Sequence, residues 1–263
     1  MSSNSAFREP DSSPAHASQA PSFSADSGCA IPGMCAPFHI SSVSTIPWVG
    51  SNVNTTSATL EEMLIVPVTK ERLPEVAGVM GRGFVDDPMM RWSVGGDVTD
   101  RRELEERYTA YFRVVNPQNV EEGWMWETQD GTGAAVWLPP DATAEFAKAD
   151  EATRPAIAAL TDDGGMRNSR FWDWLNSHIP DEPLWFLDQI AVKPARQGEG
   201  IGRALIEHGL AMSQAAGQGA YLETGNPRNV AYYERFGFRT LHEGDAPGGG
   251  PHIWFMLSEP KSA

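Results

Sequence analysis

The sequence predicts a mixed α/β fold, with helices on both faces of a central sheet. Segments of strand character alternate with segments of helical spacing from residue 64 almost to the end of the chain. The clearest junction is an apolar run at 184–192, followed by a glycine-rich turn and a helix-spaced stretch at 201–216. This alternation favours a single sheet that is covered on both sides.

The first part of this region contains two predicted helices between strands. Pro67 places the first strand near a sheet edge or a strand end. Thr99 or Asp100 is the expected N-cap of the second helix, and Pro88 indicates a link that is not helical. The predicted elements are a strand at 64–68, a helix at 73–84, the link at 86–92 and a helix at 104–115.

The second part begins with a predicted hairpin, because a turn composition at 129–133 separates two strand-like runs. A helical insert follows, and the chain then alternates strand and helix to its last two strands. These elements are strands at 124–126 and 134–138, helices within 150–178 broken at 162–165, a strand at 184–192, a helix at 201–216, a strand at 221–224, a short helix within 226–238, and two final strands.

The glycine-rich turn is the most informative motif, with Gln197, Gly198, Gly200 and Gly202 leading a strand into a helix. The backbone N–H groups and the dipole at such a helix start favour a phosphate or pyrophosphate. The spacing excludes a P-loop, which ends in Gly-Lys-Ser/Thr, and a dinucleotide fingerprint, which spaces its glycines differently. The remaining pattern is Gln-x-x-Gly-x-Gly after a strand.

Three motifs together resemble the GNAT acetyltransferase superfamily: residues 190–192, 197–202 and 226–238. The stretches Leu-Glu-Thr at 222–224, Pro-Arg-Asn at 227–229, Tyr-Glu-Arg at 233–235 and the run at 250–256 resemble its puromycin N-acetyltransferase group. The likeness is specific over 184–257 and looser over 64–183. It implies a mixed, mostly antiparallel sheet of about seven strands flanked by helices.

The resemblance implies that the acetyl donor is acetyl-CoA. Backbone N–H groups of the strand at 190–192 would meet its pantetheine arm and thioester, although ordinary ladder bonds are the alternative. Asn229 would contact the donor, or would be an ordinary helix N-cap. The expected donor-binding residues are Ile190, Ala191, Val192, Gln197, Gly198, Gly200, Ile201, Gly202, Arg203 and Asn229.

Glu223 is the candidate general base, because it lies in an otherwise uncharged strand and corresponds to the base of the puromycin group. Partial burial would raise its pKa towards neutrality, where a base works best. A surface glutamate or an ion pair with Arg228 is the alternative. Asp86, Asp87 and Asp188 are rival relays and the expected acceptor-binding residues.

Tyr233 is the candidate acid, since the matching tyrosine of the family lies near the donor sulfur. The alternative is that Tyr233 packs the helix against the sheet, a role that suits the adjacent Tyr232 as well. No Gly-x-Ser-x-Gly elbow occurs, and both cysteines, Cys29 and Cys35, precede residue 59. We therefore expect direct transfer in a ternary complex, without a covalent enzyme intermediate.

The amino-acid composition of the chain limits the classes of binding partner that we expect. The chain has a formal net charge of −15, which opposes binding to nucleic acid or anionic membranes and suits a cationic amine. Residues 1–58 are rich in Ser, Pro and Ala and are expected to be a disordered tail before an acetyltransferase domain at 59–263. Cys29, Cys35 and His39 lack a fourth ligand at a zinc-like spacing, so no metal is expected. No membrane span or secretion signal is found, which predicts a cytoplasmic protein.

The sequence thus predicts an N-acetyltransferase for a small-molecule amine, such as an antibiotic or aminonucleoside whose acetylation would confer resistance. A protein or peptide N-acetyltransferase is the first alternative, and a non-catalytic acyl-CoA-binding regulator is the second. The helical insert between Pro139 and Pro183 favours a small acceptor. A homodimer is compatible with the resemblance.

Overall fold

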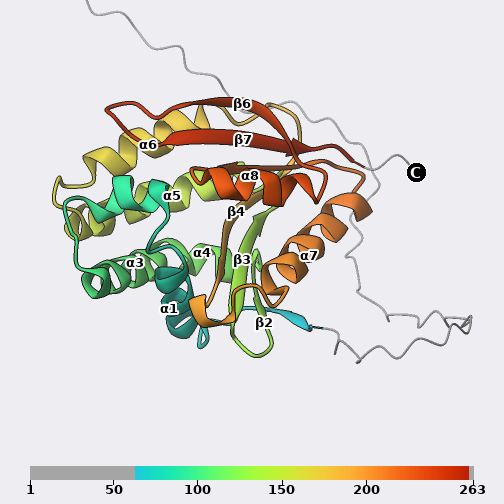
Figure 1. The fold of residues 1–263 in the computed structure, drawn as a ribbon, viewed down its shortest axis with the longest axis horizontal. Coiled ribbons are helices and arrows are strands. Elements are labelled where there is room, and N and C mark those ends of the chain that lie inside the picture. Colours follow the sequence, from blue (N-terminus) through green and yellow to red (C-terminus); the bar gives the residue numbers. More distant parts are fainter. Residues whose placement is uncertain (1–62, 261–263) are drawn as a thin grey trace, which may run out of the picture. The chain divides into compact units, whose positions relative to one another are not determined.

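Seven strands form one mixed sheet in the order β1-β2-β3-β4-β5-β7-β6 (Figure 1). The computed structural model describes residues 63–260, so the predicted tail lies outside the described residues. Among the strand pairs of residues 63–260, only β4–β5 is parallel, which confirms the mostly antiparallel sheet. The strands are β1 Ile65–Pro67, β2 Met125–Thr128, β3 Gly133–Leu138, β4 Trp185–Val192, β5 Ala220–Thr224, β6 Arg239–Asp245 and β7 His252–Ser258.

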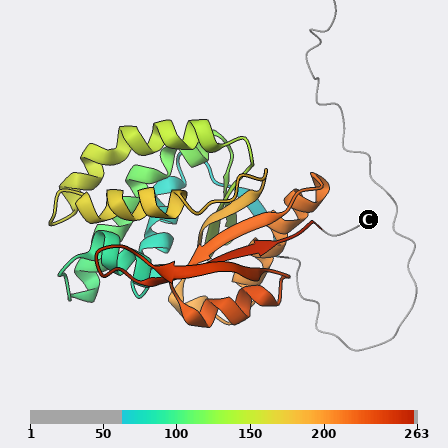
Figure 2. The same ribbon diagram turned by 90° about the horizontal axis from the view of Figure 1, so that it is seen from above.

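Helices cover both faces of this sheet. Figure 2 shows α5 and α6 on one side of the β6–β7 hairpin and α8 on the other. No helix of residues 63–260 is both long and apolar enough to cross a membrane. The helices are α1 Leu73–Gly83, α2 Pro88–Met90, α3 Arg101–Val115, α4 Pro117–Glu121, α5 Thr143–Leu160, α6 Met166–Asn176, α7 Ile201–Ala215 and α8 Pro227–Glu234.

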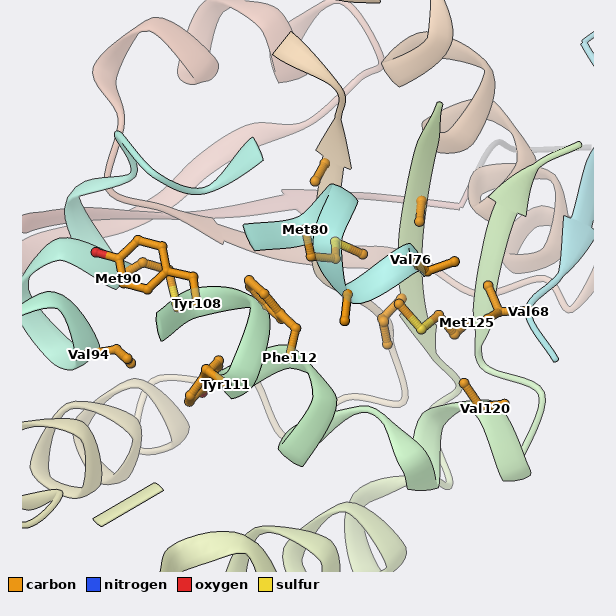
Figure 3. Close-up of a cluster of buried hydrophobic side chains, with 14 of the residues drawn as sticks. Val68, Val76, Met80, Met90, Val94, Tyr108, Tyr111, Phe112, Val120 and Met125 are labelled. Carbon is orange, nitrogen blue, oxygen red and sulfur yellow. The ribbon is translucent and has the colours of Figure 1, made fainter. Parts of the chain in front are cut away.

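Side chains alternate between the two faces along each strand, as the pleat requires. On one face, Ala134 and Val136 of β3 pack with α1 and α3 in a cluster that includes Met80 and Phe112 (Figure 3). On the other face, Trp137 packs with the apolar side of α7. Both cores converge on β3 and β4, so these two strands form a rigid support for whatever lies at their ends.

Helix α7 approaches the sheet closely because Gly209 has no side chain. A Cβ atom there would lie 1.9 Å from the ring of Trp137. The indole Nε1–H of Trp137 donates to the carbonyl of Leu205 at 3.2 Å. This contact sets the distance between α7 and β3 and thereby positions the start of α7.

Two predicted elements differ from the structure. The link at 86–92, expected to be non-helical, contains α2 and runs into a π-helix, Arg91–Gly95. Pro88 is compatible with α2 because it occupies the first turn, where its missing N–H has no intrahelical partner, and Asp87 caps the helix. The helical insert starts at Thr143, earlier than expected. Asp100 is confirmed as the N-cap of α3.

Candidate active site

Strands β4 and β5 diverge after a short paired stretch. Their parallel register joins only Trp185–Leu187 to Ala220–Leu222, although both strands continue beyond. No strand of the described residues pairs with the β5-facing edge of the rest of β4. Backbone polar groups along that edge are therefore available to a ligand, as the sequence resemblance implied for 190–192.

A β-bulge marks the point of divergence. Val136 pairs with Gln189 and Trp137 pairs with Leu187, so Asp188 has no partner on β3. An extra residue of this kind bends the strand and redirects its side chain. The bulge thus places Asp188 at the fork, directly after the last residue that pairs with β5.

One cavity of about 800 Å³ occupies the fork. All fifteen residues predicted for the site line it, whereas a second cavity of about 470 Å³ beside α1 contains none of them. The structure therefore brings together residues from the α1–α2 link, β4, the glycine turn, α7, β5 and α8. They are Asp86, Asp87, Asp188, Ile190, Ala191, Val192, Gln197, Gly198, Gly200, Ile201, Gly202, Arg203, Glu223, Asn229 and Tyr233.

The glycine turn forms one end of the cavity. Gly198 and Gly200 have φ angles of +86° and +84°, and no atom lies within 4 Å of a Cβ built on either. Both therefore need glycine for their backbone conformation, and both leave open space in front of the α7 N-terminus. This arrangement fits an anionic group held by backbone N–H donors and the helix dipole.

Two arginines and one glutamine lie at the glycine-turn end of the cavity. Arg203 is exposed and donates to Glu207 at 2.8 Å, and Arg196 donates to Glu199 at 2.7 Å. The Gln197 amide nitrogen donates to the Val192 carbonyl at 3.3 Å, which ties the turn to the end of β4. Gln197 therefore supports the turn through the β4 backbone.

Asn229 is not the N-cap of α8. Asn226 caps that helix, because its side chain accepts from the Arg228 N–H at 3.1 Å. Asn229 lies inside the first turn, lines the cavity and approaches the Thr224 hydroxyl at 3.4 Å. Of the two interpretations of Asn229, the structure removes capping and leaves a side chain that faces the cavity.

Glu223 and Asp188 form a coupled acidic pair at the fork. Loss of hydration raises the pKa of Glu223 to about 8, and the charge of Asp188 contributes to that rise. Loss of hydration also raises the pKa of Asp188 to about 6. Glu223 forms no ion pair with Arg228, and its Oε1 accepts the Tyr221 hydroxyl at 2.9 Å. The pKa of Glu223 is raised as its strand context predicted.

A chain of hydrogen-bonded side-chain amides fixes the position of Asp188. Gln189 Nε2 donates to Asp188 Oδ2 at 2.9 Å, and Asn116 Nδ2 donates to Gln189 Oε1 at 3.0 Å. Asn119 Nδ2 in turn donates to Asn116 Oδ1 at 2.8 Å, and both asparagines are buried. Sequence reasoning missed this network, since it joins the end of α3 to a strand 73 positions away.

The two tyrosines of α8 both line the cavity. Tyr233 is buried and packs against Phe238, while Tyr232 is partly exposed and lies near Gly202. Burial, followed by the nearby charge of Asp87, raises the pKa of Tyr233 above its ordinary value. Its phenol is thus neutral at pH 7 and able to donate a proton or a hydrogen bond.

The two aspartates of the α1–α2 link have different surroundings. Asp86 is exposed at the rim, and Arg101 holds both of its oxygens at 2.8 and 2.9 Å. Asp87 accepts the Met90 N–H at 3.0 Å, and loss of hydration raises its pKa to about 6. Asp87 is therefore the aspartate of this link that keeps an unpaired charge in the cavity.

Aromatic side chains that the sequence analysis did not select form the remaining wall. Phe84, Trp172 and Phe186 line the cavity and keep part of their surface exposed. Phe112 and Phe171 also line the cavity and are almost completely buried. No local motif distinguishes these residues from core aromatics, because they come from separate elements.

Known proteins share this architecture. Residues 120–238 match a sequence model of the acetyltransferase (GNAT) family. The solved structure of histone acetyltransferase HPA2 and related acetyltransferase from Corynebacterium glutamicum superposes with a TM-score of 0.56 at 22% identity, covering 77% of this chain and 98% of that one. Arylalkylamine N-acetyltransferase 2 from Aedes aegypti gives 0.50 at 12% identity, over 76% of this chain and all of that one. The matched structures share the fold.

Proposed function

We propose that this protein, residues 120–238 of which match the GNAT family model, is an acetyl-CoA-dependent N-acetyltransferase that acetylates the amine of a small molecule directly in a ternary complex. The observation that carries the proposal is the layout of one cavity. Its glycine turn suits a pyrophosphate, and its fork holds two carboxylates with raised pKa values. The anionic acetyl donor and the cationic amine acceptor would thus each meet groups that suit their charge.

The donor-binding role falls to the fork and the turn. The free edge of β4 over 190–192 offers backbone donors to an extended pantetheine arm. The turn at 197–202, together with Arg203 and Asn229, would hold the nucleotide end. The thioester supplies an activated acetyl group, and backbone N–H groups of β4 would stabilise charge that develops on its oxygen.

Glu223 is the proposed general base. An acceptor amine arrives as an ammonium ion, and the carboxylate of Glu223 takes one proton from it. The neutral nitrogen then forms its bond to the acetyl carbon as the carbon–sulfur bond breaks. The positive charge of the incoming ammonium lowers the pKa of Glu223 from about 8 towards neutrality, which favours the ionised base.

Tyr233 is the proposed acid. Its neutral phenol donates a proton to the departing thiolate, and the second proton lost by the nitrogen restores the phenol. The net reaction releases one proton, which leaves through Glu223. Asp188 remains beside Glu223 as a charge that sets its pKa rather than as a second base.

The acceptor is proposed to be small because α6 and the link that carries α2 border the cavity. The motif resemblance at 222–235 makes aminonucleosides and other antibiotic amines the first acceptors to test, with puromycin among them. Because acetyl-CoA is available in the cytoplasm, we propose that the enzyme acts there.

Thiol release from acetyl-CoA by the full chain with an amine panel tests the proposal. We expect saturating turnover on at least one amine, with kcat lowered by about 10²-fold or more in Glu223→Gln and by about tenfold or more in Tyr233→Phe. Acetylation of peptides but of no small amine would favour the peptide alternative. Tight acetyl-CoA binding without any turnover would contradict the proposal and favour a regulator.

A further inference from the structure

The active-site cavity separates its charges between its two ends. Its arginines lie directly before the glycine turn, on α7, and on or directly after α8, and its carboxylates come from the α1–α2 link, β4 and β5. Asp86 is neutralised by Arg101. The remaining three, Asp87, Asp188 and Glu223, form no ion pair with any residue of the described range 63–260. The acceptor end is therefore anionic without an internal counter-charge.

These three carboxylates form two separate anionic points. Asp188 and Glu223 follow the last paired residues of β4 and β5, and their charges act on each other. Asp87 belongs to another element, is fixed by the Met90 N–H at 3.0 Å, and acts on Tyr233 instead. A ligand with a single ammonium group neutralises one point and leaves the other charged in a site of low hydration.

An apolar wall lies in the same cavity. Phe84 from the α1–α2 link, Trp172 from α6 and Phe186 from β4 all leave part of their surface uncovered. Partly exposed aromatic side chains that line a cavity favour a flat apolar group, and they also attract cations through their faces. These aromatic residues are separate from the carboxylates. They suit a ligand in which a flat apolar frame joins two charged groups.

We propose that the acceptor is a primary amine with a second cationic group on an aromatic frame, the reacting amine at Asp188 and Glu223 and the second cation at Asp87. The proposal rests on the acetyl transfer proposed above and names its substrate class. Only one amine is acetylated, so the second group stays charged and its pairing with Asp87 persists in the product. Asp87 is thus a specificity-determining residue.

Matched amines test the second charge. The full chain would be assayed at pH 7 with para-xylylenediamine, with 4-methylbenzylamine, which replaces one aminomethyl group by a methyl, and with cadaverine, which lacks the ring. We expect kcat/KM for the aromatic diamine to exceed that for the monoamine by about tenfold or more, after division by two for its equivalent amines. The kcat/KM for cadaverine should be lower than that for the aromatic diamine.

Matched variants test the assignment to Asp87. Asp87→Asn removes the charge and keeps a side-chain oxygen for the α2 cap. In this variant the ratio of diamine to monoamine should fall to about two or less. Glu106→Gln removes one exposed carboxylate of α3 outside the cavity, where Glu106 pairs with Arg102 at 3.0 Å. It should leave the ratio unchanged, which separates a local contact from the general field of an acidic protein.

The possible outcomes are distinct. Equal kcat/KM values for diamine and monoamine would overturn the inference and leave the proposed acetyl transfer intact. A high ratio that survives Asp87→Asn would overturn the role of Asp87. Thermal unfolding with coenzyme A and each amine is read in parallel. If no amine is acetylated, a larger Tm increase with the diamine, lost in Asp87→Asn, would support the charge recognition while the proposed reaction fails. If no amine is acetylated and the Tm increases with diamine and monoamine are equal, both the charge recognition and the proposed reaction are overturned.

Discussion

The Tyr221 hydroxyl donates to Glu223 Oε1 at 2.9 Å, from two positions earlier on the same face of β5. Glu223 is also raised in pKa by burial and by Asp188, so the Tyr221 hydrogen bond is the one neighbouring contact that favours its ionised form. The pKa of the proposed base thus reflects burial and two neighbouring groups, Tyr221 and Asp188, each of which can be changed separately.

Removing the Tyr221 hydroxyl should shift the activity profile towards higher pH. In Tyr221→Phe the ionised form of Glu223 loses a charge-assisted hydrogen bond, so its pKa rises further above about 8. We expect the acidic limb of kcat/KM against pH to move up by about one pH unit. The same amine is used throughout, so that its own ionisation cancels between enzymes. An unmoved limb would show that another group governs it.

Removing the charge of Asp188 should shift the same limb the opposite way. Asp188 is ionised above about pH 6, and its charge raises the pKa of Glu223. Asp188→Asn keeps an oxygen for the Gln189 amide and removes that repulsion, so the limb should move down by roughly one pH unit. Opposite shifts in the two variants would identify Glu223 as the titrating group. A shift in the same direction in both would contradict this assignment.

The contribution of Glu223 to the stability of the domain should be smaller at alkaline than at acid pH. Its pKa is about 8 when folded against an ordinary value of 4.5, so the folded state binds more protons between these values. Stability from the protonated form is therefore fully present below pH 4.5 and is lost as pH rises towards 8. Gln resembles the protonated acid at every pH.

Thermal unfolding of the ligand-free enzyme measures this effect. We expect Glu223→Gln to unfold at nearly the same Tm as the wild type at pH 5 and several degrees higher at pH 8.5. The exposed Glu106→Gln serves as the control and should show no such change with pH. A constant difference between variant and wild type would mean that Glu223 does not carry a raised pKa.

Sequence reasoning predicted the parts of the site that are short and contiguous. The glycine turn, Glu223 and Tyr233 each lie in a motif whose spacing can be read along the chain, and all of them line the cavity. The helix that follows the turn, α7, was also predicted, because its apolar periodicity extends over more than ten residues. The assignment of their roles stays a prediction.

The parts that could not be predicted depend on pairing between distant segments. The bulge at Asp188 exists only because β3 and β4 change register, which neither strand encodes alone. Gln189 reaches Asn116 only after folding, and nothing in the local sequence distinguishes that glutamine from any other strand residue. The helical turn at Pro88 was missed because a proline reads as a break unless the capping role of Asp87 is known.

A substitution in the glycine turn should weaken donor binding without unfolding the domain. Gly200→Asp places a carboxylate where an anionic group would meet the start of α7, at a residue with φ of +84° and free space around its Cβ. We expect the Kd for acetyl-CoA, measured by calorimetry, to rise by at least about tenfold, since repulsion replaces a favourable dipole.

Gly217→Asp is the matched control, because Gly217 has φ of +68°, equally open surroundings and a place beyond the end of α7, outside the cavity. Both variants carry similar backbone strain and the same added charge, and Gly217→Asp also meets the unfavourable end of the α7 dipole, so the control should lose at least as much stability. Only Gly200→Asp should lose affinity. Equal loss in both would assign the effect to net charge or to global destabilisation, and unchanged affinity in Gly200→Asp would remove the turn from the donor site.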